Sequence, residues 1–334
     1  MAPPDGSNTI ARLPRFPLLD GPSPLQRLDR FSAALGGEVD VWIKREDLLP
    51  LAFGGNKLRN LEFLVGAALA EDADTLVTSG RRWSNHCRLT AAAGAKAGLD
   101  VHLVLSGPEL DPPGPNVVID GILGATIHQT TSEDRDERED LVKEVSTALR
   151  SAGHRPYVIA VGGSGPIGAA GQVLAGLELA GQARNAGNES PTIVVPSATG
   201  GTHAGLLVGL AIAAMPSRVL GVAVAAPAEL LRPTVVRLLG ELRDLAGTTV
   251  DPRTIDLTDA QRGAGYGIRT AAAREATELL ARTEGILVDP IYTAKALAEL
   301  IARVRDSRID GTVVFWHAGG TPGMFETLPG EPPS

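Results

Sequence analysis

The chain has 334 residues, 43% of them hydrophobic, with a formal net charge of −8 and a pI near 5.3. This length and apolar content allow a large core, divided between about two lobes. Nucleic acids and anionic membrane surfaces require a basic face on their protein partner, so the acidic balance disfavours both. The composition therefore favours a small-molecule ligand.

The chain carries no sign of a membrane span or of secretion. It has no run of about 18 apolar residues, and prolines and charges occupy the N-terminal stretch where a secretory signal has its apolar core. We therefore expect a cytoplasmic protein. The single cysteine, Cys87, excludes an internal disulfide, and the six histidines lack zinc-type spacing, so we expect no metal site.

Short β-branched runs, which predict strands, alternate with longer Ala-, Leu- and Gly-rich segments, which predict helices. In chain order the predicted strands are VDVWIKRED, DTLVTSG, DVHLVLSG, ATIHQT, PYVIAVGG, PTIVVPSATGG, RVLGVAVAA and GTVVFWHAGG. The predicted helices span residues 57–70, 85–97, 135–151, 168–186, 205–215, 228–246, 269–284 and 293–306. This alternation predicts an α/β fold of mostly parallel sheets that are covered by helices.

No internal repeat and no Gly/Ser linker separates the lobes, which indicates that they are interleaved in the sequence. We expect a small domain over residues 51–162 and a large domain built from residues 1–50 and 163–334. The proline-rich segment 108–116 is predicted as a loop, and the charged segment 132–140 as the solvent-facing start of a helix.

Four predicted strands end in clusters of small residues that lead towards helices. These junctions are TSGRRWSNHCR, VGGSGPIGAAG, PSATGGTHAGL and WHAGGTPGMF. Open parallel sheets bind their ligands at the carboxyl ends of the strands. We therefore expect the ligand at these junctions.

The second junction contains GSGPIG, residues 163–168, which matches the dinucleotide pattern G-x-G-x-x-G. A dinucleotide site also requires an acidic residue at the end of the next strand, but that strand runs into Pro196 and Ser197. A tight structural turn is the favoured interpretation. An NAD-dependent oxidoreductase is the alternative.

The third junction, SATGGTHAG at residues 197–205, predicts a phosphate site, because small residues let backbone N–H groups converge on an anion at a helix start. A nucleoside-triphosphate loop is excluded, since leucine and not a hydroxyl residue follows Lys57. One phosphate without a metal indicates a cofactor monophosphate. A glycine-rich turn that only packs helix on strand is the alternative.

The first junction offers both a helix cap and a ligand contact. Ser84 fits either role, and the two roles are compatible. His86 and Cys87 are neighbours in a predicted helix, where successive side chains point about 100° apart, so they do not form a nucleophile and its base.

Together these segments resemble the pyridoxal-phosphate enzymes of the tryptophan-synthase-β-like fold (fold type II), within them the group of D-cysteine desulfhydrase and 1-aminocyclopropane-1-carboxylate (ACC) deaminase. The segments that carry the resemblance run in family order over most of the chain: IKREDLLPLAFGGNKLRNLEFL, DTLVTSG with SNHCR, RPYVIAVGGSGPIGAAG, GGTHAGLLVGL, GAGYG, EGILVDPIYTAKAL and WHAGGTPGMF. The resemblance implies two open twisted sheets, pyridoxal 5′-phosphate as cofactor, a small amino acid as substrate, and a homodimer.

The resemblance also implies roles for single residues. Lys57 matches the lysine that binds the cofactor covalently and then moves the substrate's α-proton, which requires an amine of lowered pKa. Asn85 matches the residue that binds the ring hydroxyl, and Ser84 a serine at the substrate carboxylate or a proton carrier. Tyr266 and Tyr292 match two tyrosines around substrate and cofactor. The implied phosphate positions are Ala198, Thr199, Gly200, Gly201, Thr202, His203 and Ala204, and the implied substrate contacts are Trp83, Ser84, Asn85, His86 and Gly163.

Thr293 distinguishes the relatives. ACC deaminases have a glutamate here that keeps the cofactor's ring nitrogen protonated, whereas threonine leaves it closer to neutral, and this favours β-elimination. The SNHC sequence also favours the desulfhydrase side. We therefore expect a lyase that releases pyruvate, ammonia and a leaving group such as sulfide. The alternatives are ACC deamination, β-replacement on a specialised amino acid, and a cofactor-binding protein without activity.

The sequence also departs from the family pattern at several positions. Trp83 and Leu89 replace glutamines, Gly165 replaces a common asparagine, and Trp316 with His317 replaces smaller apolar residues. These differences affect the expected substrate and leave the expected cofactor unchanged.

Overall fold

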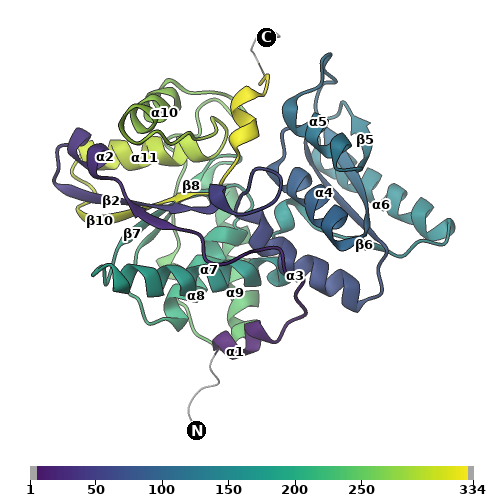
Figure 1. Ribbon diagram of the computed structural model, residues 1–334, viewed down its shortest axis with the longest axis horizontal. Helices are drawn as coiled ribbons and strands as arrows, with labels where there is room; N and C mark the ends of the chain where they lie inside the picture. Colours follow the sequence, from purple (N-terminus) through teal and green to yellow (C-terminus); the bar gives the residue numbers. More distant parts are fainter. Residues whose placement is uncertain (1–5, 330–334) are drawn as a thin grey trace.

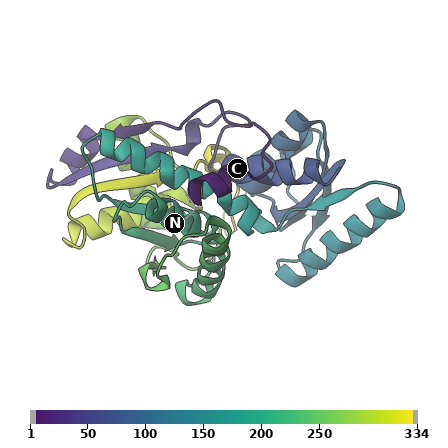
Figure 2. The ribbon, with the colours of Figure 1, turned by 90° about the horizontal axis from the view of Figure 1, so that it is seen from below.

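The computed structural model describes residues 6–329, which form two lobes, each built on its own sheet (Figures 1 and 2). Nearly all strand pairs are parallel, and helices flank both sheets. The predicted α/β class with two mostly parallel sheets is thereby confirmed.

The larger sheet has six strands in the order β1-β2-β10-β7-β8-β9, and only the edge pair β1 and β2 is antiparallel. Its strands are β1 (Leu25–Arg27), β2 (Val39–Arg45), β7 (Thr192–Ser197), β8 (Val219–Ala223), β9 (Asp256–Thr258) and β10 (Gly311–His317). One face is covered by α1 (Gly6–Ala11), α7 (Pro166–Asn185), α8 (Gly201–Ile212) and α9 (Ala228–Ala246). The other face is covered by α2 (Asp29–Ala34), α10 (Ala271–Glu284) and α11 (Thr293–Arg305). Successive residues of β7 alternate between these two cores, as the two-residue period of a strand requires.

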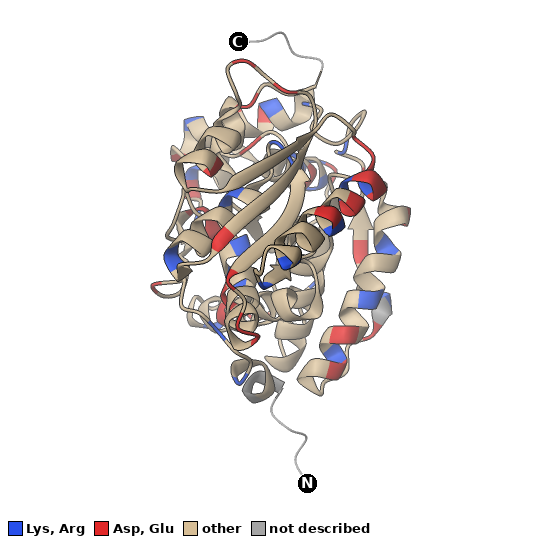
Figure 3. Ribbon diagram, turned by 90° about the vertical axis from the view of Figure 1, so that its right-hand side faces the viewer, with Lys and Arg blue, Asp and Glu red and all other residues tan. Residues whose placement is uncertain are grey.

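The smaller sheet has four parallel strands in the order β5-β4-β3-β6. They are β3 (Thr75–Arg81), β4 (Asp100–Ser106), β5 (Thr126–Thr130) and β6 (Pro156–Val158). Helices α3 (Lys57–Ala70), α4 (Asn85–Ala97) and α5 (Pro115–Ile122) lie on one face, and α6 (Arg135–Ser151) on the other. Helix α3 packs on both α4 and α7 and so joins the two lobes. Figure 3 shows this side of the molecule, where acidic and basic residues alternate along α6.

Helices α3, α4, α6 and α9 begin and end at the predicted residues. Helix α7 begins earlier than predicted, at Pro166, because proline suits the first helical position, where its missing N–H costs no hydrogen bond. The segment predicted as a loop at 108–116 ends inside α5, so that prediction is wrong for its last two residues. The strands of the smaller sheet lie within residues 51–162, and the division of the chain into domains stays a prediction.

Candidate active site

A cavity of about 410 Å³ lies where strands β3, β7, β8 and β10 end, between the two sheets. All four glycine-rich junctions of the sequence contribute to its wall. Of the residues predicted for the site, the structure brings Lys57, Ser84, Asn85, His86, Ala198, Thr199, Gly200, Gly201, Thr202, Tyr266 and Tyr292 together around it.

Lys57 is the first residue of α3, and its side chain reaches across the cavity. Its Nζ donates a hydrogen bond to the backbone oxygen of Gly162, at 2.8 Å. The side chain is partly accessible through the cavity, yet the surrounding protein desolvates its amine. Burial lowers the pKa of Lys57 from 10.5 to about 8, because a dry environment penalises the charged form. A sizeable fraction of neutral amine is therefore present at physiological pH.

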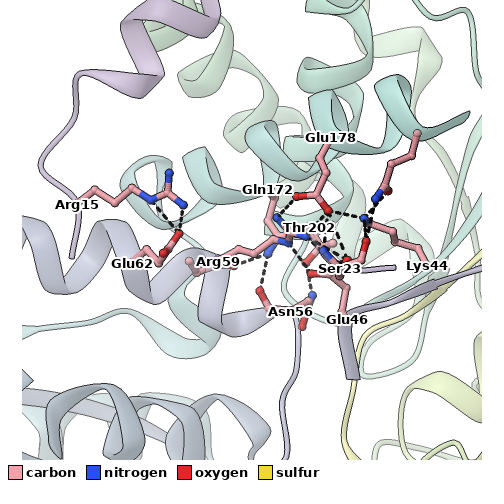
Figure 4. Close-up of polar contacts among 12 residues, drawn as sticks. Arg15, Ser23, Lys44, Glu46, Asn56, Arg59, Glu62, Gln172, Glu178 and Thr202 are labelled. Carbon is pink, nitrogen blue, oxygen red and sulfur yellow. Dashed lines mark hydrogen bonds and ion pairs between the residues drawn. The ribbon is translucent and has the colours of Figure 1, made fainter. Parts of the chain in front are cut away.

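Polar contacts fix the start of α3 to the large lobe (Figure 4). The Nδ2 of Asn56 donates to the hydroxyl of Thr202 at 2.9 Å, which ties the residue before the lysine to the start of α8. From α7, the Nε2 of Gln172 donates to the backbone oxygen of Asn56 at 2.8 Å and to the Oδ1 of Asn60 at 2.6 Å. These buried bonds leave the lysine's backbone little freedom to move.

A buried cluster of charges surrounds Arg59, two residues along α3 from Lys57 (Figure 4). Arg59 donates to Glu46 at 2.6 and 2.8 Å and to Glu178 at 2.9 Å, and Lys44 also contacts Glu178. Burial opposes the charge on Arg59, but the two carboxylates outweigh it and raise its pKa. The cluster joins β2, α3 and α7.

Helix α4 presents its first residues to the cavity. Ser84 caps the helix, since its Oγ accepts a hydrogen bond from the N–H of Cys87 at 3.2 Å. The buried Arg88 donates to the Oδ1 of Asn85 at 3.0 Å and to the backbone oxygen of Gly54 at 3.1 Å. The arginine thus links Asn85 to the loop before Lys57 and fixes its Oδ1 as an acceptor within the protein.

His86 and Cys87 are held in uncharged forms. The hydroxyl of Thr78 donates to the backbone oxygen of Ile159 at 2.9 Å, so it accepts from the Nε2 of His86 at 3.0 Å. Burial, aided by the charge of Lys57, lowers the pKa of His86 to about 3. Burial raises the pKa of Cys87 to about 12, and its thiol is therefore unreactive.

The start of α8 has the character of an anion site. Gly200 adopts a left-handed conformation at φ 81°, and the first turn of the helix leaves N–H groups without partners inside the helix. Ser197 is buried, and its hydroxyl has no hydrogen-bond partner among the described residues. Donors without partners at a helix start fit one phosphate group. Within residues 6–329 no group of three His, Cys, Asp or Glu residues is placed to hold a metal ion.

Two tyrosines, Tyr266 and Tyr292, line the same cavity as Lys57. The hydroxyls of Tyr266 and Tyr292 are in contact, and their ring centroids are 5.9 Å apart. Burial raises the pKa of both phenols, so both stay protonated. Trp83 contacts the ring of Tyr266 in an edge-on arrangement, with the ring centroids 5.8 Å apart. The Trp83 side chain is buried and does not line the cavity.

Five predicted residues do not line the cavity: Trp83, Gly163, His203, Ala204 and Thr293. His203 turns away from the cavity towards Gly221 of β8, where any side chain would clash with its ring. Thr293 is fully buried at the start of α11. Its hydroxyl donates to the carboxylate of Asp289 and accepts from the Asp289 N–H at 2.9 Å, so its one proton is not available to a ligand.

Several polar residues of the site were not predicted from the sequence motifs. Arg81, at the end of β3, and Arg138, on α6, both line the cavity. The unusual GRRW sequence was the signal for the first, whereas α6 was predicted only as a solvent-facing helix. Asp289 was also missed, although its carboxylate accepts from the N–H groups of Ile291 and Tyr292 and holds the turn that carries this tyrosine.

Comparison with known proteins gives consistent results. The sequence pattern of the family described as pyridoxal-phosphate dependent enzyme matches residues 17–319. A D-cysteine desulfhydrase of Yersinia enterocolitica is 40% identical over 327 residues, which cover 96% of this chain and 98% of the relative. The crystal structure of an ACC deaminase homologue, 36% identical, superposes with a TM-score of 0.90 over 96% of both chains.

A more distant solved structure shares the fold alone. The processed form of threonine deaminase isoform 2 from Solanum lycopersicum superposes with a TM-score of 0.68 at 18% identity, over 94% of this chain and 83% of its own. The family pattern spans most of this chain and the nearer relatives match it nearly end to end. The chain therefore belongs to the pyridoxal-phosphate dependent enzymes, and within them to the group of D-cysteine desulfhydrase and ACC deaminase.

Proposed function

We propose that the protein is a lyase that eliminates a substituent from the β-carbon of a small amino acid, in the manner of D-cysteine desulfhydrase. The observation that carries the proposal is Lys57, a lysine of lowered pKa that faces the same cavity as the start of α8. The 40% identity to a D-cysteine desulfhydrase supports this choice of activity.

The residues around the cavity fit pyridoxal phosphate. Lys57 would hold its aldehyde carbon, Asn85 its ring hydroxyl, and residues 198–202 with Ser197 its phosphate. When bound, this cofactor supplies the electron sink that stabilises negative charge on the substrate's α-carbon.

The chain's own residues then have separate tasks in the proposed reaction. The Nζ of Lys57 takes the α-proton, a task that its lowered pKa suits. Ser84 and the first N–H groups of α4 bind the substrate carboxylate, because a helix start favours anions. The paired hydroxyls of Tyr266 and Tyr292 line the cavity and serve as donors to the departing group. The neutral phenols can deliver a proton to it.

Absorption spectroscopy tests the proposal. The holoenzyme is expected to show the visible band of lysine-bound cofactor and to release pyruvate and ammonium from D- or L-cysteine. Lys57→Ala is expected to lose both, while Lys143→Ala, at an exposed lysine of α6, keeps them. A wild-type protein that added cofactor cannot colour would refute the proposal.

ACC deamination is a second candidate, because the ACC deaminase homologue has nearly the same fold. Thr293 disfavours it, since this residue is not an acid and its hydroxyl proton is committed to Asp289. Release of 2-oxobutyrate from ACC would identify this activity, and transfer of an added thiol onto the product would identify β-replacement.

We also propose that the protein is a homodimer and that it is located in the cytoplasm. The proposed small domain spans residues 51–162, and the rest of the chain forms the large domain. Light scattering of the purified holoenzyme measures the oligomeric state, and cell fractionation measures the localisation. Among residues 6–329, no helix is both long and apolar enough to cross a bilayer.

A further inference from the structure

The cavity wall next to the tyrosines carries two guanidinium groups, those of Arg81 and Arg138. We infer that these arginines bind a second anionic group on the substrate, so that the enzyme prefers amino acids whose β-substituent is itself an anion, such as a sulfonate or a phosphate ester. The inference rests on the proposed function and names the substrate class of that site.

Arg138 is the stronger evidence, because it is a buried cation without a counter-ion. Its residue is 6% exposed, and it makes no ion pair within the described part of the chain. Its Nη1 donates to the hydroxyl of Ser106 at 2.9 Å, while its Nε has no partner there. Burial and the nearby charge of Arg81 both lower its pKa. An uncompensated buried charge is costly, which indicates that a ligand supplies the missing anion.

Arg81 is only weakly compensated. Its Nη1 is buried without a partner, and its Nη2 faces the backbone and side-chain oxygens of Glu133 at 3.4 and 3.3 Å. The Glu133 side chain is 60% exposed, so this ion pair is weak and a ligand can displace it. The guanidinium lies 5.9 Å from the ring centre of Trp83, which supports it from outside the cavity. Trp83 is therefore a positioning residue.

The cavity wall holds two cations that the proposed cofactor site does not use. Arg81 is weakly paired and Arg138 is unpaired among the described residues, whereas Arg135 is paired with Glu139 at 2.7 Å. The start of α4 is available for the substrate's α-carboxylate. The two arginines lie beyond it, near Tyr266, whose pKa burial raises and the charge of Arg81 partly lowers. They are thus placed for a second anion on the β-carbon.

Arg81 and Arg138 are also suited to stabilise the β-substituent as it leaves. In the elimination, the α-proton goes to Lys57, and the bond from the β-carbon to the leaving atom breaks with its electron pair on that atom. A sulfonate leaves as sulfite and a phosphate ester as phosphate, each with one more negative charge than the bound group. Water then hydrolyses the released enamine to pyruvate and ammonia. Guanidinium groups stabilise the growing charge more than they stabilise the bound substrate, which is the condition for catalysis.

A binding measurement tests the pair without any turnover. Aspartate and asparagine match in shape and differ in one charge, and neither carries a β-leaving group. By calorimetry on the holoenzyme, aspartate is expected to bind at least about 10-fold more tightly than asparagine, as a charge-assisted contact implies. Arg81→Gln and Arg138→Gln are expected to abolish this preference, and Glu133→Gln to increase it by removing the competing carboxylate.

The matched control is Arg150→Gln, the same change at the exposed end of α6, which is expected to keep the wild-type preference. If Arg138→Gln does not fold, Arg81→Gln and Glu133→Gln still test the inference. These two residues lie at the end of β3 and in the loop before α6, so their substitution leaves helix α6 unchanged. Equal affinity of the wild type for aspartate and asparagine would overturn the inference.

Turnover separates this inference from the proposed function. Both enantiomers of cysteate, O-phosphoserine and cysteine are supplied, and sulfite, phosphate, sulfide and pyruvate are measured. The anionic substrates are expected to have the higher kcat/KM, with a loss of about 100-fold in Arg81→Gln, the effect of removing one such donor. Whether sulfite or phosphate forms faster identifies the leaving group. Turnover of cysteine alone leaves the proposed function intact and overturns the inference, whereas no turnover of any β-substituted amino acid overturns the proposed function.

Discussion

The buried charge cluster around Arg59 predicts a large and specific loss of stability when this arginine is removed. Arg59 and Lys44 together balance Glu46 and Glu178 (Figure 4). Arg59→Met keeps much of the side-chain volume but leaves two carboxylates to one cation, and Glu46 is 0% exposed. Removing one partner of a buried ion pair costs about 3–5 kcal/mol of unfolding free energy. Urea unfolding followed by circular dichroism measures the loss from the shift in midpoint.

A second substitution makes this test specific. Glu46→Gln in the Arg59→Met background restores the charge balance, so the double variant is expected to be at least about 1 kcal/mol more stable than the sum of the two single changes implies. The control is Arg237→Met, which breaks an exposed ion pair of 2.7 Å with Glu241 and is expected to change stability by about 0.5 kcal/mol or less. A loss below about 1 kcal/mol in Arg59→Met, or strict additivity with Glu46→Gln, would refute the electrostatic reasoning.

Two further predictions concern the lysine and the contact between α3 and α7. In the cofactor-free protein, acylation of Lys57 at limiting reagent is expected to rise with pH through a midpoint near 8, because only the neutral amine reacts; a midpoint near 10.5, measured by mass spectrometry, would contradict the desolvation argument. Gly171→Ala is expected to destabilise the protein by more than about 2 kcal/mol, because its Cβ would lie 1.9 Å from the backbone oxygen of Arg59. Gly181→Ala on the same helix has open space and is expected to stabilise it by up to about 1 kcal/mol; similar midpoints for both variants would contradict this packing.

The parts of the fold that the sequence predicts well are those with strong local signals. Helices α3 and α9 have long apolar patterns, and β4 is a short run rich in valine and leucine, so local residues dictate their extent. The missed strands β1 and β9 are three residues each and gain their structure from the sheet edge that they join.

The same distinction between local signals and tertiary packing applies to the candidate site. Gly-rich junctions indicate where a ligand lies, because backbone geometry there depends on residue type. The directions of individual side chains depend on tertiary packing, so the sequence could not indicate that Thr293 faces Asp289 or that His203 faces β8. Nor could it indicate that Arg138, 54 residues beyond Ser84 along the chain, lines the same cavity, since only the packing of α6 on the small sheet brings them together.

The hydrogen bond from Lys57 to Gly162 has a consequence for how this lysine acquires its basicity. A carboxylate partner would hold the ammonium form and keep the amine inert, whereas a backbone carbonyl contributes only a dipole. That carbonyl belongs to a left-handed pair, with φ 69° at Gly162 and 61° at Gly163, which residues with side chains rarely adopt. Two glycines about a hundred positions away in the chain therefore place the oxygen that accepts from the amine. A Cβ added at Gly162 would lie 2.8 Å from the Oγ1 of Thr199, and one added at Gly163 would lie 3.0 Å from the Cδ1 of Leu64, so a side chain at either position would displace this oxygen.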